Sequence, residues 1–196
     1  MIIAKINAKN IARAIKILKN NGIIVYPTDT AYALGGFFDS KKAISRILKI
    51  KKRKNDKFTI IASGLNQVRK YFKLNPVQVK LAKKYWPGPL SLVVSPKFAV
   101  RVPDNSIARK LARSAGRPLI ATSANLSGQT ALYSGQEVIK EFAGEKYRPD
   151  LILAAGRLKK RKTSTIARVG DDGEIEILRE GAVKLSDKRQ ATSDKD

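Results

Sequence analysis

Small hydroxyl and amide side chains follow a short hydrophobic strand in the segment PLIATSANLSG, residues 118–128. Polar residues that bind ligands in open α/β sheets gather at the carboxyl ends of strands, so Ser123 and Asn125 are candidate ligand contacts. The alternative is structural, because either side chain could instead cap the turn that follows.

Two further segments have the same arrangement. In VYPTDTAYALGG, residues 25–36, a hydrophobic strand ends close to Thr28 and Thr30, although threonines at such a position are also ordinary turn residues. In GRLKKRKTSTIARV, residues 156–169, a basic loop leads into a strand at Ser164. Each segment therefore has both a ligand-binding and a structural interpretation.

Lys51 and Arg53 add fixed positive charge. They end a predicted helix, where the helix dipole alone also favours cations. Together with three hydroxyl-rich strand ends, this pair predicts a cleft for phosphate and carboxylate groups. Arg53 offers such anions a planar fork of donors, whereas Lys51 acts as a point charge.

The chain contains no histidine and no cysteine, so the commonest general base and the thiolate nucleophile are both missing. This composition also argues against a structural zinc site. Neither the phosphate-loop pattern nor the dinucleotide glycine fingerprint occurs. A cleft suited to phosphate and carboxylate groups would need no general base.

Net charge is the strongest compositional signal, at +24 over 196 residues. It indicates a polyanionic partner or a phosphate-rich ligand, unless it reflects a lysine-rich proteome as a whole. No apolar run approaches the ~20 residues of a membrane span, and the first residues do not resemble a signal peptide. These features predict a cytoplasmic protein with no membrane partner.

Hydrophobic periodicity predicts alternating strands and helices. Helices are expected at 8–20, from Asp39 or Ser40 onward, and at 76–85, 105–114 and 134–143. Strands are expected at 2–6, 23–26, 58–63, 89–95, 99–103, 118–123, 150–155, 163–169 and 174–179, with a loop at 27–38. This pattern predicts one α/β domain with a mixed sheet over 1–183, followed by a disordered tail at 184–196.

Seven motifs carry a family resemblance and occur in this order: YPTDTAYALGG, KIKKRKNDKF, YWPGPLSLVV, AVRVPD, PLIATSANLSG, STIARV and ILREGAV. Over roughly residues 8–183 the chain resembles the threonylcarbamoyl-AMP synthase (YrdC-like) family, in its short single-domain form. The resemblance implies a single twisted mixed-sheet domain with helices packed around it and a basic concave cleft.

The resemblance also implies an activity, that of a nucleotidyltransferase. L-threonine, bicarbonate and ATP would give threonylcarbamoyl-AMP and pyrophosphate, with Mg²⁺ carried by the ATP and no metal ligands in the chain. Downstream threonylcarbamoyl transferase machinery would then modify the adenosine beside the anticodon of tRNA.

The family's functional residues carry over position by position. Implied as catalytic, at the ATP phosphates and the nucleotide, are Lys51, Arg53, Ser123 and Asn125. Implied as nucleotide contacts are also Lys57 and Arg179, and as threonine contacts Thr30, Arg101 and Ser164. Departures at Ala62, where some relatives have histidine, and at Thr163, where many have proline, leave the preferred amino acid open.

Two other functions remain open. The first is a non-catalytic module on the same fold that binds tRNA, ribosomal RNA or other double-stranded RNA, as the net charge would allow. The second is a carbamoyl-transfer enzyme that uses carbamoyl phosphate. Relatives of that second kind embed this domain in much longer chains with cysteine-bearing modules, which this sequence lacks.

Overall fold

A computed structural model describes residues 1–185 and contains six helices and two mixed sheets. The helices are α1 (Ala8–Lys19), α2 (Lys41–Lys51), α3 (Leu65–Tyr71), α4 (Pro76–Tyr85), α5 (Ser106–Ala115) and α6 (Gly135–Ala143). The predicted α/β class is therefore confirmed. The predicted tail, 184–196, lies almost wholly outside the described residues, and the domain boundary at 183 stays a prediction.

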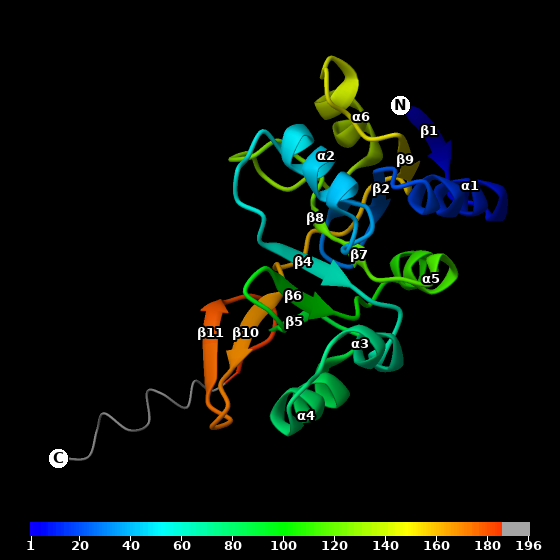
Figure 1. The fold of residues 1–196 in the computed structure, drawn as a ribbon. Helices are drawn as coiled ribbons and strands as arrows, with labels where there is room; N and C mark the ends of the chain where they lie inside the picture. The colour runs from blue at the N-terminus through cyan, green and yellow to red at the C-terminus, as the bar shows by residue number, and fades with distance from the viewer. Residues whose placement is uncertain (186–196) are drawn as a thin grey trace.

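The sequence predicted one sheet, whereas the strands form two. In spatial order the five-stranded sheet contains β1 (Ile2–Lys5), β9 (Leu151–Ala154), β2 (Ile24–Pro27), β3 (Tyr32–Gly35) and β8 (Thr122–Ser123). The six-stranded sheet contains β11 (Ile175–Arg179), β10 (Thr165–Val169), β5 (Leu90–Val93), β6 (Phe98–Arg101), β4 (Phe58–Ile61) and β7 (Leu119–Ile120). Figure 1 shows the first sheet in the upper half of the molecule and the second in the lower half.

The segment 119–123 joins the two sheets. It was predicted as one strand, but β7 pairs with β4 of the six-stranded sheet and β8 pairs with β3 of the five-stranded sheet. At the crossing, the backbone of Gly35 lies against the carbonyl of Ile120, where a Cβ atom would collide with the oxygen. Glycine is therefore required at 35 by close backbone approach rather than by its dihedral angles.

Two elements went unpredicted. The expected loop at 27–38 contains β3, which pairs antiparallel with β2 from Ile24–Gly35 to Pro27–Tyr32. Helix α3 has only seven residues, and Gly64 at its N-cap provides no side-chain hydrogen bond. Short elements without a capping signal or a clear period leave little trace in a sequence.

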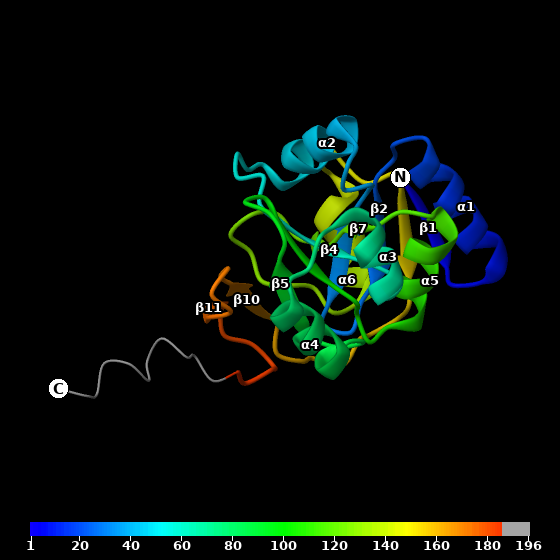
Figure 2. The same cartoon turned by 60° about the horizontal axis from the view of Figure 1, so that its bottom comes forward.

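Successive side chains of β2 pack into two separate hydrophobic cores, because they point to opposite faces of the sheet. Val25 belongs to a core that α2 and α6 cover, whereas Ile24 and Tyr26 belong to a core that α1 and α5 cover. A third, smaller cluster lies between α4 and strands β5 and β10. Figure 2 brings α3 and α4 forward, in front of the six-stranded sheet.

Helix starts follow the capping signals in the sequence. Of the two predicted caps of α2, Ser40 is the one used, because its side chain accepts from the amide of Ala43 at 3.1 Å. The predicted Asn75 cap of α4 is confirmed and forms a reciprocal capping box with Gln78.

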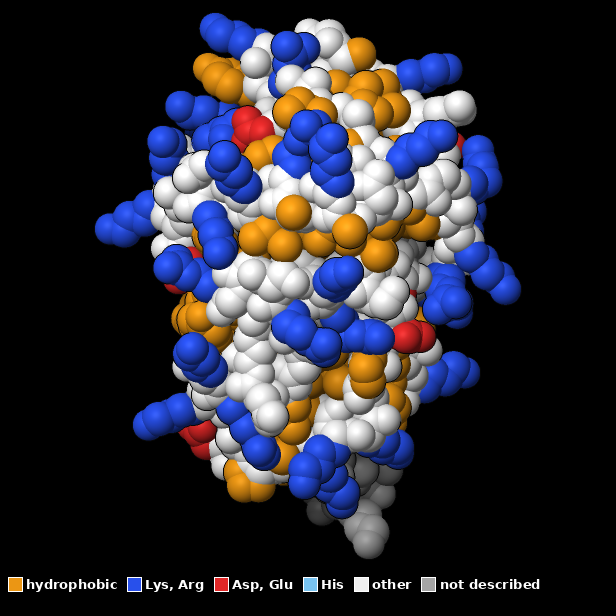
Figure 3. All heavy atoms as spheres, turned by 90° about the vertical axis from the view of Figure 1, so that its right-hand side faces the viewer, with side chains coloured by type: hydrophobic (Ala, Val, Ile, Leu, Met, Phe, Trp, Pro, Cys, Tyr) orange, Lys and Arg blue, Asp and Glu red, His pale blue; other side chains and the backbone are white. Residues whose placement is uncertain are grey.

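Positive charge covers much of the surface. Figure 3 shows the face that carries α1, α5 and β1, where Lys and Arg side chains are spread broadly and few acidic side chains appear. On this face the charge is not gathered into one patch, so net charge alone does not locate a partner. Within residues 1–185, no helix combines the length and apolarity that crossing a bilayer requires.

Candidate active site

A cleft of about 470 Å³ opens beside the junction of the two sheets. Its walls come from the β2–β3 loop, the end of α2, strands β4 to β6, β8 and the β10–β11 hairpin. The lining residues include the cationic side chains Arg53, Lys57, Lys97, Arg101, Arg168 and Arg179. The predicted basic character of the cleft as a whole stays a prediction, to which this lining lends support.

Arg101 forms the centre of one end of the cleft. Its Nη1 atom donates to both oxygens of Asp29, at 2.7 and 2.9 Å, and its Nη2 atom donates to Oγ1 of Thr30 at 3.2 Å. The Arg101 and Asp29 side chains are 4% and 2% exposed, so this is a buried ion pair. The predicted contact residues Thr30 and Arg101 thus lie side by side, with Arg101 already charge-compensated.

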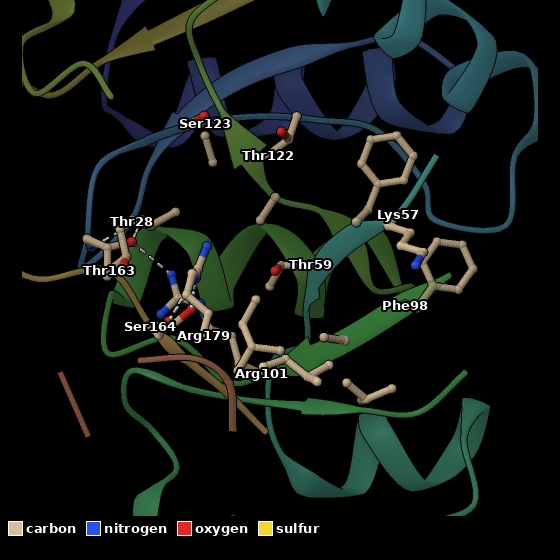
Figure 4. A pocket seen from close by; sticks show the side chains of 18 of the residues that line it. Thr28, Lys57, Thr59, Phe98, Arg101, Thr122, Ser123, Thr163, Ser164 and Arg179 are labelled. Atoms are coloured by element: carbon tan, nitrogen blue, oxygen red, sulfur yellow. Dashed lines mark hydrogen bonds between the residues drawn. The ribbon is translucent and has the colours of Figure 1, made fainter. Parts of the chain in front are cut away.

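Ser164 and Arg179 complete the same end (Figure 4). Arg179 donates to the carbonyl of Ser164 at 2.7 Å and to its hydroxyl at 3.0 Å, and the hydroxyl also lies 3.0 Å from that of Ser91. Burial lowers the pKa of Arg179, and the nearby charge of Arg101 lowers it further. Asp29 pairs with Arg101, whereas the printed bonds of Arg179 go to Ser164, so this end carries excess positive charge that favours a bound anion.

Arg53 and Lys57 lie toward another part of the cleft, where Figure 4 shows Lys57 beside Phe98 and away from Arg179. Arg53 donates to the carbonyl of Lys57 at 3.1 Å and stacks 4.7 Å from the ring centre of Phe58. Its Nε atom is buried and has no hydrogen-bond partner. A buried donor without a partner is costly, so this guanidinium is poised for a ligand that accepts from it.

The end of α2 determines how the Lys-x-Arg pair is displayed. Lys51 is the last helical residue, and Lys52 adopts a left-handed conformation with φ 52° and ψ 42°. Lys51 before this turn is buried, whereas Arg53 after it lines the cleft.

The structure places two of the expected catalytic residues behind the wall of the cleft, and their roles stay predictions. Lys51 and Asn125 are each 3% exposed and neither lines the cleft, whereas Arg53 and Ser123 do. Both polar atoms of the Asn125 amide already have a partner, since Oδ1 accepts from Lys51 and Nδ2 donates to the carbonyl of Gln129. Arg53, Ser123, Lys57, Arg179, Thr30, Arg101 and Ser164 all line the cleft, as expected of contact residues, but their roles stay predictions.

Several lining residues were missed by the sequence interpretation: Thr59, Lys97, Phe98, Tyr133 and Arg168. Lys160 of the basic loop lies 5.7 Å from the ring centre of Tyr133. Lys97 lies in the β5–β6 turn, and Phe98 is the first residue of β6. Nothing in the local sequence of this turn distinguishes it from an ordinary surface turn. Only the pairing of β6 with β4 brings it to the cleft.

The two departures from the family pattern have different positions. Ala62 is fully buried in the core and does not line the cleft. Thr163 does line the cleft and stands next to Ser164 (Figure 4). Of the two, Thr163 is the one placed to contact a ligand in the cleft.

Comparison with known proteins places the chain in a family. A family model named for Sua5, YciO and YrdC, and described as telomere recombination, matches residues 16–181. The chain belongs to this family. It is 39% identical to the threonylcarbamoyl-AMP synthase of Psychromonas ingrahamii over 146 residues, which cover 66% of this chain and 76% of that one.

Two solved structures of the Sua5/YciO/YrdC family support the fold. P. abyssi Sua5 complexed with L-threonine matches 92% of this chain with a TM-score of 0.80 and 29% identity. This chain spans only 56% of that longer protein. E. coli YciO matches with a TM-score of 0.79 and 28% identity, covering 93% of this chain and 95% of the other.

Proposed function

We propose that this chain is a threonylcarbamoyl-AMP synthase, which forms threonylcarbamoyl-AMP and pyrophosphate from L-threonine, bicarbonate and ATP. The observation that carries the proposal is that different kinds of side chain line two parts of one cleft. Arg53, Lys57 and Ser123 suit phosphates at one part, and the Arg101–Thr30 and Arg179–Ser164 pairs suit a small polar anion at the other.

The chemistry requires no general base from the protein. The threonine amine and bicarbonate give a carbamate and water, and a carbamate oxygen then attacks the α-phosphorus of ATP. One P–O bond forms while the bond to the leaving pyrophosphate breaks, which makes the protein a nucleotidyltransferase. Because negative charge crowds this transition state, fixed cations and donors can supply most of the catalysis.

Arg53 is the residue we expect to contribute most to the chemical step. The planar fork of its guanidinium group can donate to phosphate oxygens without first breaking an ion pair. Burial lowers the pKa of Arg53, while nearby Asp56 opposes that shift. Arginine remains protonated under such perturbation, so its charge is available throughout the working pH range.

We expect the threonine to lie at the Arg101 end. Thr30 and Ser164 present hydroxyl groups there, and the two arginines provide excess positive charge for the amino-acid carboxylate. Mg²⁺ would arrive with the ATP, since Asp29, the carboxylate nearest this end, is held by Arg101. Transfer of the product to tRNA by separate machinery, and a cytoplasmic location, belong to the same proposal.

RNA affinity is a second property that one observation favours. A groove of about 610 Å³ runs beside α2 and shares Arg53, Lys97 and Phe98 with the cleft. Four further cations line it: Lys41, Lys49, Lys52 and Lys54. Such a groove suits backbone phosphates of tRNA or other double-stranded RNA, which would bind near the cleft without replacing its chemistry.

The RNA property has a matched test. Triple substitution of Lys41, Lys49 and Lys54 by Ala should remove about two to three phosphate contacts with tRNA. The slope of log K against log salt concentration should become correspondingly shallower. The control carries the same charge change on α1, at exposed Lys9, Lys16 and Lys19. If both triple variants lose affinity equally, net charge rather than the groove carries the binding.

The synthase itself is tested by pyrophosphate release. Release should require ATP, L-threonine and bicarbonate together, and Arg53→Ala should lower kcat by about 10²- to 10³-fold, as loss of a transition-state donor does. Arg113→Ala, an exposed arginine on α5 away from the cleft, is the matched control. No release under any combination, with salt-sensitive tRNA binding intact, would instead support the non-catalytic RNA-binding module.

A further inference from the structure

The ammonium group of Lys51 is enclosed by oxygen atoms of one loop. Its Nζ atom lies 2.6 Å from the carbonyl oxygen of Asn125, 2.7 Å from that of Ser123 and 3.1 Å from Oδ1 of Asn125. An ammonium group has three protons, so these three nearest acceptors use its donor capacity, and Oγ of Ser123 lies farther away, at 3.5 Å. No proton is left for a phosphate in the cleft.

The same loop is held from a second helix. The amide of Leu126 donates to Oε1 of Glu141 on α6 at 2.6 Å. Within the loop, Nδ2 of Asn125 donates to the carbonyl of Gln129 at 2.5 Å. Residues 123–129 are thus fixed between α2 and α6, and Ser123 is the member of this loop that reaches the cleft.

We infer that Lys51 is a positioning residue, which holds the backbone of Ser123 and Asn125 so that the Ser123 hydroxyl is presented to the nucleotide. This inference rests on the proposed function for the identity of the nucleotide. In this arrangement Arg53 and Ser123 contact the ligand. Lys51 and Asn125 lie behind these two residues and hold the loop in place, and we call Lys51 and Asn125 the latch. Each of the two motifs, Lys-x-Arg and Ser-x-Asn, therefore contributes one residue that contacts the ligand and one residue of the latch.

The latch depends on protonation. Burial, and to a lesser extent the charge of Arg53, lowers the pKa of Lys51 to about 8, against the opposing charge of Glu141 on α6. Above that pH the neutral amine keeps two N–H groups for three oxygen acceptors and turns its lone pair toward one of them. The contacts to Ser123 and Asn125 then weaken, and with them the position of the Ser123 hydroxyl.

Deprotonation of Lys51 should affect nucleotide affinity and the free energy of unfolding in different directions. The folded pKa of Lys51 lies below the unfolded value of 10.5, so between the two values the unfolded chain binds more protons. The contribution of this group to stability therefore rises with pH across that window. Nucleotide affinity should fall above pH 8 while the contribution of Lys51 to the free energy of unfolding does not fall.

The first test is a double-mutant cycle on ATP affinity, measured by calorimetry without threonine so that no turnover occurs. Lys51→Met and Ser123→Ala should each weaken ATP binding, and the double variant should be no weaker than the weaker-binding single variant. Lys42→Met removes an exposed charge from the same helix and should leave the affinity unchanged. Multiplicative losses in the double variant would overturn the inference, because they mean independent contacts.

The second test is the pH profile of ATP affinity between pH 7.5 and 9.5. In the wild type the affinity should decline with a midpoint near pH 8, with circular dichroism unchanged, whereas Lys51→Met lacks the titrating group and should give a flat profile. The same decline in both proteins would overturn the inference, and so would a flat wild-type profile, which does not depend on whether any variant folds. Because no step uses threonine or bicarbonate, failure of the synthase assay is a separate outcome.

Discussion

Asp29 and Arg101 lie 72 residues apart in the chain and form a buried ion pair on the wall of the cleft. The pair ties the β2–β3 loop to the end of β6, and thereby one sheet to the other. Oδ2 of Asp29 also accepts from the amide of Asp104 at 3.2 Å. The pair thus serves both the junction of the sheets and the site.

Removing the carboxylate should destabilise the fold. Asp29→Ala leaves the buried guanidinium of Arg101 without its counterion, and such a loss costs about 3–5 kcal/mol in free energy of unfolding. The double variant Asp29→Ala/Arg101→Met, which removes both charges, should recover much of this loss. Urea denaturation measures both, and a single-variant cost below about 1 kcal/mol would contradict a buried, dependent pair.

The left-handed Lys52 gives a second prediction. A non-glycine residue pays about 1–2 kcal/mol in this conformation, whereas glycine adopts it freely but loses about 0.5–1 kcal/mol in chain entropy. The difference of about 0.5–1 kcal/mol favours glycine, and loss of the ion pair with Glu145 offsets part of it, so Lys52→Gly should raise the free energy of unfolding by about 0–0.5 kcal/mol. Lys49→Gly, in the body of the same helix, should lower it by about 1 kcal/mol. Equal effects of the two glycines in thermal melts would show that residue 52 stores no strain.

Much of the fold follows from the sequence because most elements carry a period and a cap. Helix α1 has the period, and α4 adds a reciprocal cap at Asn75. The division into two sheets does not follow, because it depends on where the chain crosses at Ala121. Its amide donates to the carbonyl of Thr59, and the strand changes sheets there. Pairing between distant strands leaves no local signal.

The sequence predicted which residues gather around the cleft better than it predicted which of their side chains face it. Most of the expected contact residues line one cleft, yet Lys51 and Asn125 lie behind its wall. A spacing of two would keep Ser123 and Asn125 on one face only if the strand continued, and β8 ends at Ser123. The turn after β8 directs Asn125 into the protein, toward Lys51.

Thr30 should affect threonine more than ATP. Its hydroxyl accepts from Arg101 and lies 3.2 Å from that of Thr28. Thr30→Val keeps the shape and removes a hydrogen bond worth about 0.5–1.5 kcal/mol, so the KM for threonine should rise by about two- to tenfold. The KM for ATP, measured in the same pyrophosphate-release assay, should stay within about twofold. An equal rise in both constants would place Thr30 away from the amino-acid end.

Asp150 should make the stability of the fold depend on acid pH. Burial raises the pKa of this carboxyl, but hydrogen bonds from Arg46 and from the amide of Ile23 outweigh burial and leave the pKa below its usual 3.8. A depressed folded pKa stabilises the protein above the unfolded value, and this stability is lost as the pH falls through the folded pKa. The free energy of unfolding should therefore fall between about pH 5 and pH 2.

Asp150→Asn tests whether this one carboxylate is responsible. The variant should be less stable at pH 7 by about 1–2 kcal/mol, since it weakens hydrogen bonds to a half-exposed charge, and its stability should depend less on acid pH than that of the wild type. Asp171→Asn, at an exposed turn, is the control and should keep the wild-type slope. If all three proteins lose stability in parallel below pH 5, the acid sensitivity comes from other carboxylates. The Asp150 contacts to α2 and to the amide of Ile23 would then hold regardless of its charge.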